Sequence, residues 1–195
     1  EGSQLVALAL AESDAPEGPW LDLCAGPGGK AALLAGLAMQ QGSTLLASEL
    51  QPHRAELVAQ ALRAYDGPHR PQAIAADGTR PAWASGRFAR VMADVPCTGL
   101  GALRRRPESR WRRTPEHLAE LVPLQRRLLT SALDSAAPGG VVAYVTCSPH
   151  RDETEGVLAA VLADRDDVTR ESTTQLWPHR DGTDAMFCAL LRRRA

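Results

Sequence analysis

Residues 20–31 are Trp-Leu-Asp-Leu-Cys-Ala-Gly-Pro-Gly-Gly-Lys-Ala, a short apolar run followed by a glycine-rich turn. The run from Trp20 to Cys24 has the length of a buried strand, whereas residues 30–41 are rich in alanine and leucine and end at Gly42. This pattern predicts a strand, a tight loop and a helix in succession. Such a unit is typical of α/β proteins with a parallel sheet.

The alternation of strands and helices continues to the end of the chain. Further strands are predicted at residues 44–49, 72–76, 88–94, 141–146, 168–173 and 185–191, and further helices at 3–12, 52–65, 114–137 and 153–163. Thr114 and Pro115 suit the N-cap and first turn of the longest helix, and Pro123 is expected to kink or divide it. The sequence therefore predicts a Rossmann-like α/β fold with a mostly parallel seven-stranded sheet and helices on both faces, in one domain over residues 1–195.

Length and composition narrow the function classes before any motif is considered. The 195 residues suffice for one α/β domain, and 44% hydrophobic residues supply its core. The 22 basic and 23 acidic side chains give a net charge of -1, so any surface for nucleic acid has to be local. No apolar run approaches the roughly 20 residues of a membrane span, and no signal peptide is recognisable. We expect a cytoplasmic monomer without membrane contact.

Acidic residues end the predicted strands at the edge where α/β proteins bind ligands. Glu49, Asp77 and Asp94 end the second, third and fourth strands, and the loop at 26–31 fits the loose dinucleotide pattern G-x-G-x-x-A. Glycines that only form a tight turn and acids that only cap strands would explain the same residues. Together they favour a pocket for a nucleoside-bearing cofactor. NAD brings a pyrophosphate, whereas S-adenosylmethionine carries a cationic sulfonium, which suits an acidic rim.

The four cysteines are scattered, without the Cys-x-x-Cys spacing of a zinc site, so neither a metal centre nor a disulfide framework is predicted. Cys24 and Cys188 lie in apolar runs and are expected to pack in the core. Cys97 and Cys147 instead follow the fourth and fifth strands, which should be neighbours, so both thiols would converge beside the cofactor. A thiolate that adds to C6 of a pyrimidine would activate C5 for methylation.

Three motifs together resemble those of the RNA cytosine-5 methyltransferases, especially the bacterial small-subunit rRNA enzymes also called Fmu or Sun proteins. They are residues 22–30 (Asp-Leu-Cys-Ala-Gly-Pro-Gly-Gly-Lys), 94–99 (Asp-Val-Pro-Cys-Thr-Gly) and 146–148 (Thr-Cys-Ser). The resemblance covers nearly the whole chain and implies a class I S-adenosylmethionine-dependent methyltransferase catalytic domain. It also implies methyl transfer to C5 of a cytosine in RNA through a covalent bond between a cysteine and C6. Ribosomal RNA is the expected substrate, with transfer RNA as the alternative.

The resemblance implies a role for each residue of the three motifs. The cysteine of the Thr-Cys-Ser motif is the nucleophile in that family, which by position is Cys147, and the cysteine after Asp-x-Pro, here Cys97, is linked to product release. Lys30 and Asp94 would face the target cytosine, although a solvated lysine in the first turn of a helix is the alternative for Lys30. The implied S-adenosylmethionine contacts are Cys24, Ala25, Gly26, Pro27, Gly28, Gly29, Lys30, Glu49, Asp77 and Asp94.

The departures from the family pattern are few. Ala31 and Thr98 replace a threonine and a serine, and Thr154 interrupts an acid-Asn-acid pattern. None of these changes removes a proposed catalytic group. Family members usually carry RNA-recognition domains upstream of the point at which this chain begins, and the chain starts at Glu1 without a methionine, so a fragment of a longer protein is expected.

A run of arginines follows the Cys97 loop. It comprises Arg104, Arg105, Arg106, Arg110, Arg112 and Arg113. Arginine runs usually form solvated surface, but this one lies beside the predicted site and includes Trp111, which could stack on a base, so we predict contacts with RNA phosphates. Two interpretations from other classes stay open. An NAD-dependent oxidoreductase would leave the cysteine pair and the arginines unexplained, and a catalytically weak RNA-binding scaffold would keep only the fold.

Overall fold

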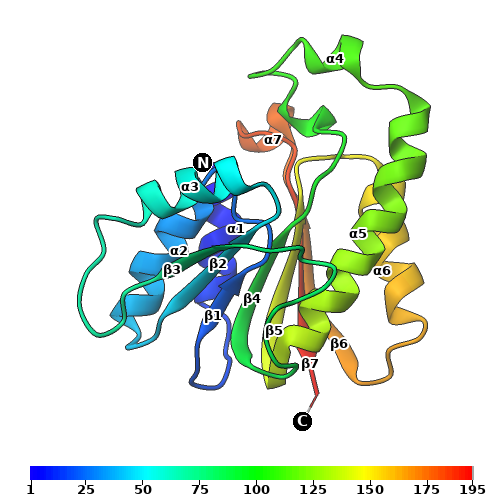
Figure 1. Cartoon of the computed structure of the whole chain (residues 1–195). Helices are drawn as coiled ribbons and strands as arrows, with labels where there is room; N and C mark the ends of the chain where they lie inside the picture. Colours follow the sequence, from blue (N-terminus) through cyan, green and yellow to red (C-terminus); the bar gives the residue numbers. More distant parts are fainter. Residues whose placement is uncertain (195) are drawn as a thin grey trace.

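The computed structural model describes residues 1–194 and contains a seven-stranded sheet in the order β3-β2-β1-β4-β5-β7-β6 (Figure 1). The strands are β1 (Trp20–Asp22), β2 (Leu45–Glu49), β3 (Gln72–Ala75), β4 (Phe88–Asp94), β5 (Ala136–Thr146), β6 (Val168–Gln175) and β7 (Phe187–Arg193). Neighbours among β1 to β5 pair in parallel, and β7 is antiparallel to β5 and β6. The predicted mostly parallel, doubly wound sheet is confirmed.

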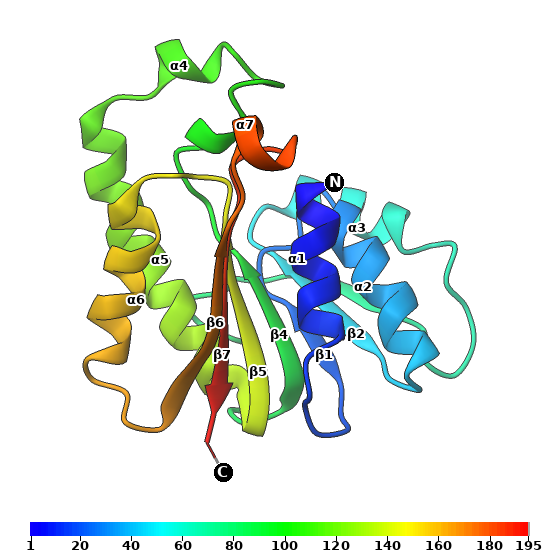
Figure 2. The same ribbon diagram turned by 180° about the vertical axis from the view of Figure 1, so that it is seen from behind.

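Helices cover both faces of this sheet. They are α1 (Gly2–Ala11), α2 (Gly29–Gln40), α3 (Pro52–Ala61), α4 (Ser109–Arg112), α5 (Pro115–Ser135), α6 (Glu155–Leu162) and α7 (Pro178–Asp181), with short 3-10 turns η1 (Leu100–Ala102) and η2 (Arg151–Glu153). Opposite views show α1, α2 and α3 on one face and α5 and α6 on the other (Figures 1 and 2). The two short helices α4 and α7 lie at the end of the sheet where the parallel strands finish.

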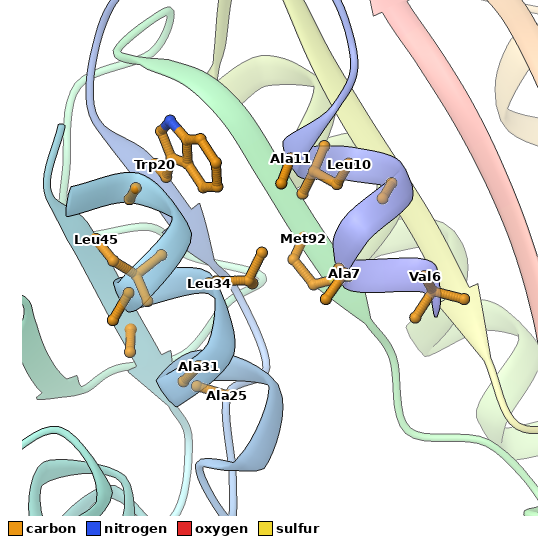
Figure 3. Close-up of a cluster of buried hydrophobic side chains, with 14 of the residues drawn as sticks. Val6, Ala7, Leu10, Ala11, Trp20, Ala25, Ala31, Leu34, Leu45 and Met92 are labelled. Atoms are coloured by element: carbon orange, nitrogen blue, oxygen red, sulfur yellow. The ribbon is translucent and has the colours of Figure 1, made fainter. Parts of the chain in front are cut away.

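Alternate side chains of the central strands supply the core on each face, because successive residues of a strand point in opposite directions. In β4, Met92 packs in the cluster under α1 and α2, whereas Val91 packs in the cluster under α5 and α6. Figure 3 shows Met92 between Ala7 of α1 and Leu34 of α2, and all three side chains are fully buried. This core fixes α2, whose N-terminus follows the glycine loop.

Pro123 lies inside α5, which runs without interruption from Pro115 to Ser135. The prediction that Pro123 divides this helix is therefore wrong. A proline cannot donate to the carbonyl four residues earlier, here that of Ala119, but both residues are exposed, so water can hydrogen-bond to this carbonyl. The other side of α5 packs Leu129 and Leu133 into the core, which holds the helix together across the proline.

Element bounds differ from the predicted ones most at the junction of α5 and β5. The predicted strand begins at residue 141, whereas β5 begins at Ala136, directly after α5. Ala136 pairs with Phe88, and a register irregularity between Phe88 and Arg90 accommodates the additional segment. Further along, η2 occupies the predicted start of the helix at 153–163, and α6 begins at Glu155. Within residues 1–194, no helix is both long and apolar enough to cross a membrane.

Candidate active site

Two thiols meet where β4 and β5 end. The strands are neighbours in parallel register, with Asp94 opposite Val145, so the loops that follow them begin side by side. Cys97 lies in the first loop and Cys147 in the second, and their Sγ atoms are 3.4 Å apart. Both side chains are partly buried. The convergence of these two cysteines agrees with the sequence-based expectation, and Cys24 and Cys188 are not part of the pair.

The two thiols differ in acidity. The hydrogen bond from Cys97 lowers the pKa of Cys147, against the effects of burial and of the Asp94 charge, and the positive charge of Lys30 lowers it further. The same hydrogen bond to Cys147 raises the pKa of Cys97, and burial and the negative charges of Cys147, Glu153 and Asp94 add to the rise. Cys147 is therefore the more acidic thiol of the pair, and Cys97 is the one favoured as the donor.

Lys30, in the first turn of α2, extends to the end of β4. Its Nζ lies 2.7 Å from Oδ2 of Asp94, and their side chains are 17% and 26% exposed. Burial alone would lower the pKa of Lys30, but the charge and hydrogen bond of Asp94 outweigh it and raise the pKa. The lysine is held charged in an ion pair beside the thiols, so the alternative of a freely solvated lysine does not fit this geometry.

The glycine loop packs against Glu49. The backbone N–H groups of Gly26 and Gln51 each donate to the carboxylate of Glu49 at 3.0 Å, and Arg54 Nη2 donates to the carbonyl oxygen of Gly26 at 2.6 Å. A Cβ on Gly26 would collide with this carboxylate, so Glu49 could keep its present position only with glycine there. In this structure Glu49 holds the loop in place, and the residue is only 5% exposed.

Two further groups shape the same edge of the sheet. Gly28, the N-cap of α2, has φ of 113°, and a Cβ there would come within 2.9 Å of the Cβ of Ala61. Asp77 follows β3, and its Oδ1 accepts from the backbone N–H and the hydroxyl of Thr79 at 2.9 and 2.8 Å. These hydrogen bonds lower the pKa of Asp77, so the carboxylate is charged.

Asp22 is a site residue that the sequence analysis did not single out. It ends β1 and is 1% exposed, and neither carboxylate oxygen has a hydrogen-bond partner in the described residues. Burial raises its pKa from 3.8 to about 7; the charge of Asp94 adds to the rise, and the charge of Lys30 and the nearby backbone N–H of Cys24 act against it. A buried carboxyl without a partner is costly and suits a ligand with a cationic or hydrogen-bond-donating group. The available signal was an acid within the apolar run at residues 20–24.

The arginine run divides into fixed and free side chains. Arg105 donates to Oδ2 of the buried Asp184 through Nε at 2.7 Å and Nη2 at 2.5 Å, and Arg113 donates to the carbonyl oxygen of Thr98 at 2.9 Å. Within residues 1–194, no side-chain hydrogen bond or ion pair involves the exposed side chains of Arg104, Arg106, Arg110 and Arg112. Trp111 is 83% exposed in α4, at the same end of the sheet (Figure 1).

The remaining cysteines have no comparable surroundings. Burial raises the pKa of Cys24 well above that of a free thiol and that of Cys188 to about 12. Cys24 lies just after β1 and packs against the core beneath α5, and Cys188 is buried in β7. Among residues 1–194, no group of three or more His, Cys, Asp or Glu side chains is arranged to hold a metal ion.

Comparison with known proteins agrees with this geometry. Residues 5–192 match the family model described as 16S rRNA methyltransferase RsmB/F. The chain belongs to that family. RsmB/F proteins form a family of S-adenosylmethionine-dependent methyltransferases, so the resemblance to the Fmu and Sun enzymes is confirmed at the level of the family.

Several named proteins are similar to this RsmB/F chain. The "Putative methyltransferase Rv1407" of Mycobacterium tuberculosis strain H37Rv is 52% identical over 99% of this chain and 45% of its own length. The ribosomal RNA small subunit methyltransferase B of Thermus thermophilus is 35% identical over 89% of this chain and 44% of its own length. The chain thus spans about half the length of the curated relatives it matches.

Solved structures confirm the class I methyltransferase fold. The crystal structure of PH0851 is similar with a TM-score of 0.89 and 28% identity, over 99% of this chain and 46% of that chain. The structure of NSun6 from Pyrococcus horikoshii with SFG has a TM-score of 0.81 and 23% identity, over 100% of this chain and 52% of that chain. At that identity the second likeness concerns the fold alone.

The raised pKa of Asp22 predicts a pH-dependent stability. Between about pH 4 and pH 7 the unfolded chain has lost this proton while the folded chain retains it, so the free energy of unfolding should fall as the pH rises. Asp22→Asn should therefore stabilise the fold at pH 8, by up to about 4 kcal/mol, and leave it unchanged near pH 4. Urea unfolding of both proteins across this range measures the difference.

Asp164→Asn is the matched control, because Asp164 is exposed and should show no such pH-dependent gain. A uniform loss of stability for Asp22→Asn at every pH would contradict the burial of an uncompensated charge.

Proposed function

We propose that this chain is the catalytic domain of an enzyme that transfers a methyl group from S-adenosylmethionine to C5 of a cytosine in RNA. Ribosomal RNA is the favoured substrate, and transfer RNA is the alternative. The observation that carries the proposal is the pair of thiols 3.4 Å apart, in which Cys147 has the lowered pKa. The ion pair of Lys30 and Asp94 and the glycine loop lie at the same edge of the sheet. This combination serves covalent attack on a pyrimidine better than it serves hydride transfer.

The residues at this edge fit S-adenosylmethionine. Asp22 supplies buried carboxylate oxygens that have no hydrogen-bond partner among residues 1–194, and Gly26 and Gly28 let the loop pack closely against Glu49 and Ala61. Glu49 and Asp77 add negative charge around the loop, which suits a cofactor with a sulfonium and an ammonium group. We assign binding to these residues together with Asp94 and residues 24–30. When bound, the cofactor supplies an electrophilic methyl group.

Cys147 supplies the nucleophile in this mechanism. Its thiolate sulfur forms a bond to C6 of cytosine, and the displaced π electrons make C5 reactive toward the methyl group. Lys30 and Asp94 are positioned to hydrogen-bond the ring as its charge changes. A base then takes the proton from C5, the electrons of that bond form the C5–C6 double bond, and the carbon–sulfur electron pair returns to Cys147, which restores the aromatic ring. We assign assistance with this release to Cys97, the neighbour of the sulfur that must leave.

The free arginines support an RNA surface. Arg104, Arg106, Arg110 and Arg112 project from the segment between the Cys97 loop and α5, together with the exposed Trp111. We propose that these four contact phosphates, while Arg105 and Arg113 mainly anchor the segment through Asp184 and Thr98. The target base has to leave its stack to approach a partly buried thiol.

Substitution of each of the two cysteines should block a different step of the reaction. Cys147→Ala should form no adduct with RNA and transfer no methyl group, because C5 stays unreactive without addition at C6. Cys97→Ala should still add and methylate but release poorly, so a denaturant-resistant protein–RNA complex accumulates. The measurement is a denaturing gel of the whole gene product with labelled ribosomal RNA from a strain that lacks the gene, and S-adenosylmethionine.

Cys188→Ala is the matched control, and we expect it to turn over without a trapped complex. A trapped complex with Cys147→Ala but not with Cys97→Ala would reverse the assignment of the two roles. Normal methyl transfer by both variants would exclude the covalent mechanism. Transfer RNA from the same strain, tested in parallel, distinguishes the two RNA substrates.

Cofactor binding tests the assignment of the acids. Asp77→Ala and Asp22→Asn should each weaken S-adenosylmethionine binding about 10- to 100-fold, because loss of a hydrogen bond to a charged group costs about 1.5–3 kcal/mol. Isothermal titration calorimetry measures both constants, with Asp164→Asn as the control that should bind normally. Tighter binding of NAD than of S-adenosylmethionine would overturn the methyltransferase assignment in favour of the oxidoreductase.

The arginines predict a salt-dependent affinity. The double substitution Arg104→Gln and Arg106→Gln should lower the affinity for RNA and make that affinity less dependent on salt. The slope of the logarithm of the binding constant against the logarithm of the salt concentration should change by about 0.7 for each single-strand phosphate that an arginine no longer neutralises.

Arg105→Gln should instead lower the stability of the fold, because Asp184 would remain buried without its partner. Filter binding at several salt concentrations and thermal unfolding separate the two effects, and an unchanged slope for the double variant would leave these arginines as solvated surface.

A further inference from the structure

Glu153 is a buried carboxylate to which the mechanism above gives no part. Its side chain is fully buried in η2, six residues after Cys147. No salt bridge to Glu153 occurs among the described residues, and its carboxylate accepts hydrogen bonds only from neutral groups. A carboxylate buried without a counter-ion costs stability, so its surroundings should reveal what it contributes.

Its contacts hold the loop that carries Cys97. Oε1 accepts from the backbone N–H of Thr98 at 2.8 Å, and Oε2 accepts from the hydroxyl of Thr98 at 2.5 Å. Nε2 of Gln125 donates both to Oε1 of Glu153 and to the carbonyl oxygen of Pro96, each at 2.9 Å. Thr98, directly after Cys97, therefore binds Glu153 itself, and Pro96, directly before Cys97, is linked to Glu153 through Gln125.

The same network extends to the loop that carries Cys147. The hydroxyl of Thr98 has one hydrogen and donates it to Glu153, so the hydroxyl of Ser148, 3.3 Å away, is the donor to Thr98. Ser148 directly follows Cys147 and accepts in turn from the backbone N–H of His150 at 3.1 Å. A continuous chain of hydrogen bonds thus joins Glu153 to the residue after each cysteine.

We propose that Glu153 is a positioning residue that holds the thiol of Cys97 in hydrogen-bond contact with the sulfur of Cys147. The inference rests on the proposed function for its catalytic meaning, but the contact itself is a property of the free protein. The negative charge of Glu153 also contributes to the raised pKa of Cys97, which keeps this cysteine the donor of the pair. Without Glu153, Cys97 would no longer be held as the donor to Cys147.

The first test needs neither RNA nor cofactor. Iodoacetamide alkylation of Cys147, followed by mass spectrometry across a pH series, reports the pH at which its thiolate forms. Glu153→Gln should move this midpoint upward by about one unit, an approximately tenfold loss of thiolate at neutral pH, and Cys97→Ala should do the same. Glu155→Gln, a matched change at a residue paired with Arg170 outside this network, should leave the midpoint unchanged.

The second test uses the denaturing gel with labelled ribosomal RNA from a strain that lacks the gene. Glu153→Gln should resemble Cys97→Ala, forming the covalent complex but releasing it at least about tenfold more slowly than the unaltered protein. A residue needed only for folding would lower adduct formation and release together, without accumulation of the complex. Glu155→Gln should turn over normally.

The outcomes separate the inference from the proposed function. If Cys97→Ala raises the alkylation midpoint while Glu153→Gln does not, the positioning role is overturned. If the midpoints move together but no variant ever traps RNA, the positioning role stands and the covalent mechanism fails. Should Glu153→Gln not fold, Thr98→Val decides, because it removes the hydroxyl link while keeping the backbone hydrogen bond; an unchanged midpoint in that variant overturns the inference.

Discussion

Asp94 lies opposite Val145 in the parallel register of β4 and β5, and this pairing places the loops after the two strands side by side. Each loop carries one cysteine, so the contact between the thiols depends on the register before it depends on any side chain. A shift of one residue would turn the inward-facing side chains of a strand to the opposite face. The buried clusters on both faces of the sheet therefore hold the chemistry in place.

Charge at this edge of the sheet is unevenly matched. Lys30, the sole lysine of the sequence, pairs with Asp94 and also faces Cys147, while Asp22 and Glu49 add further carboxylates close by. Arg54 lies 3.7 Å from Glu49, so among the described residues Asp22 is the acid of this group without a cationic partner. The pKa of Cys147 is nevertheless lowered, because the hydrogen bond from Cys97 has the larger effect. A short-range contact thus outweighs a longer-range repulsion.

The sequence was sufficient to predict the fold and the meeting of the two thiols, because the alternation of elements indicates a mostly parallel sheet and both cysteines follow strands expected to be neighbours. It was not sufficient for features that depend on distant partners. Arg105 pairs with Asp184, 79 residues away, and nothing near Arg105 in the sequence indicates this. The continuity of α5 at Pro123 depends on solvent exposure of that side of the helix. The roles of the site residues stay predictions.

Asp22 has a consequence for protein engineering. Screens for thermal stability reward substitutions that remove buried charge without compensation, and by that criterion Asp22 is an attractive position to change. If the carboxylate of Asp22 binds a ligand, such a screen would select a more stable protein that binds this ligand less tightly. Libraries aimed at stabilising this domain should therefore keep residue 22 fixed and seek their gains in the exposed sides of the helices.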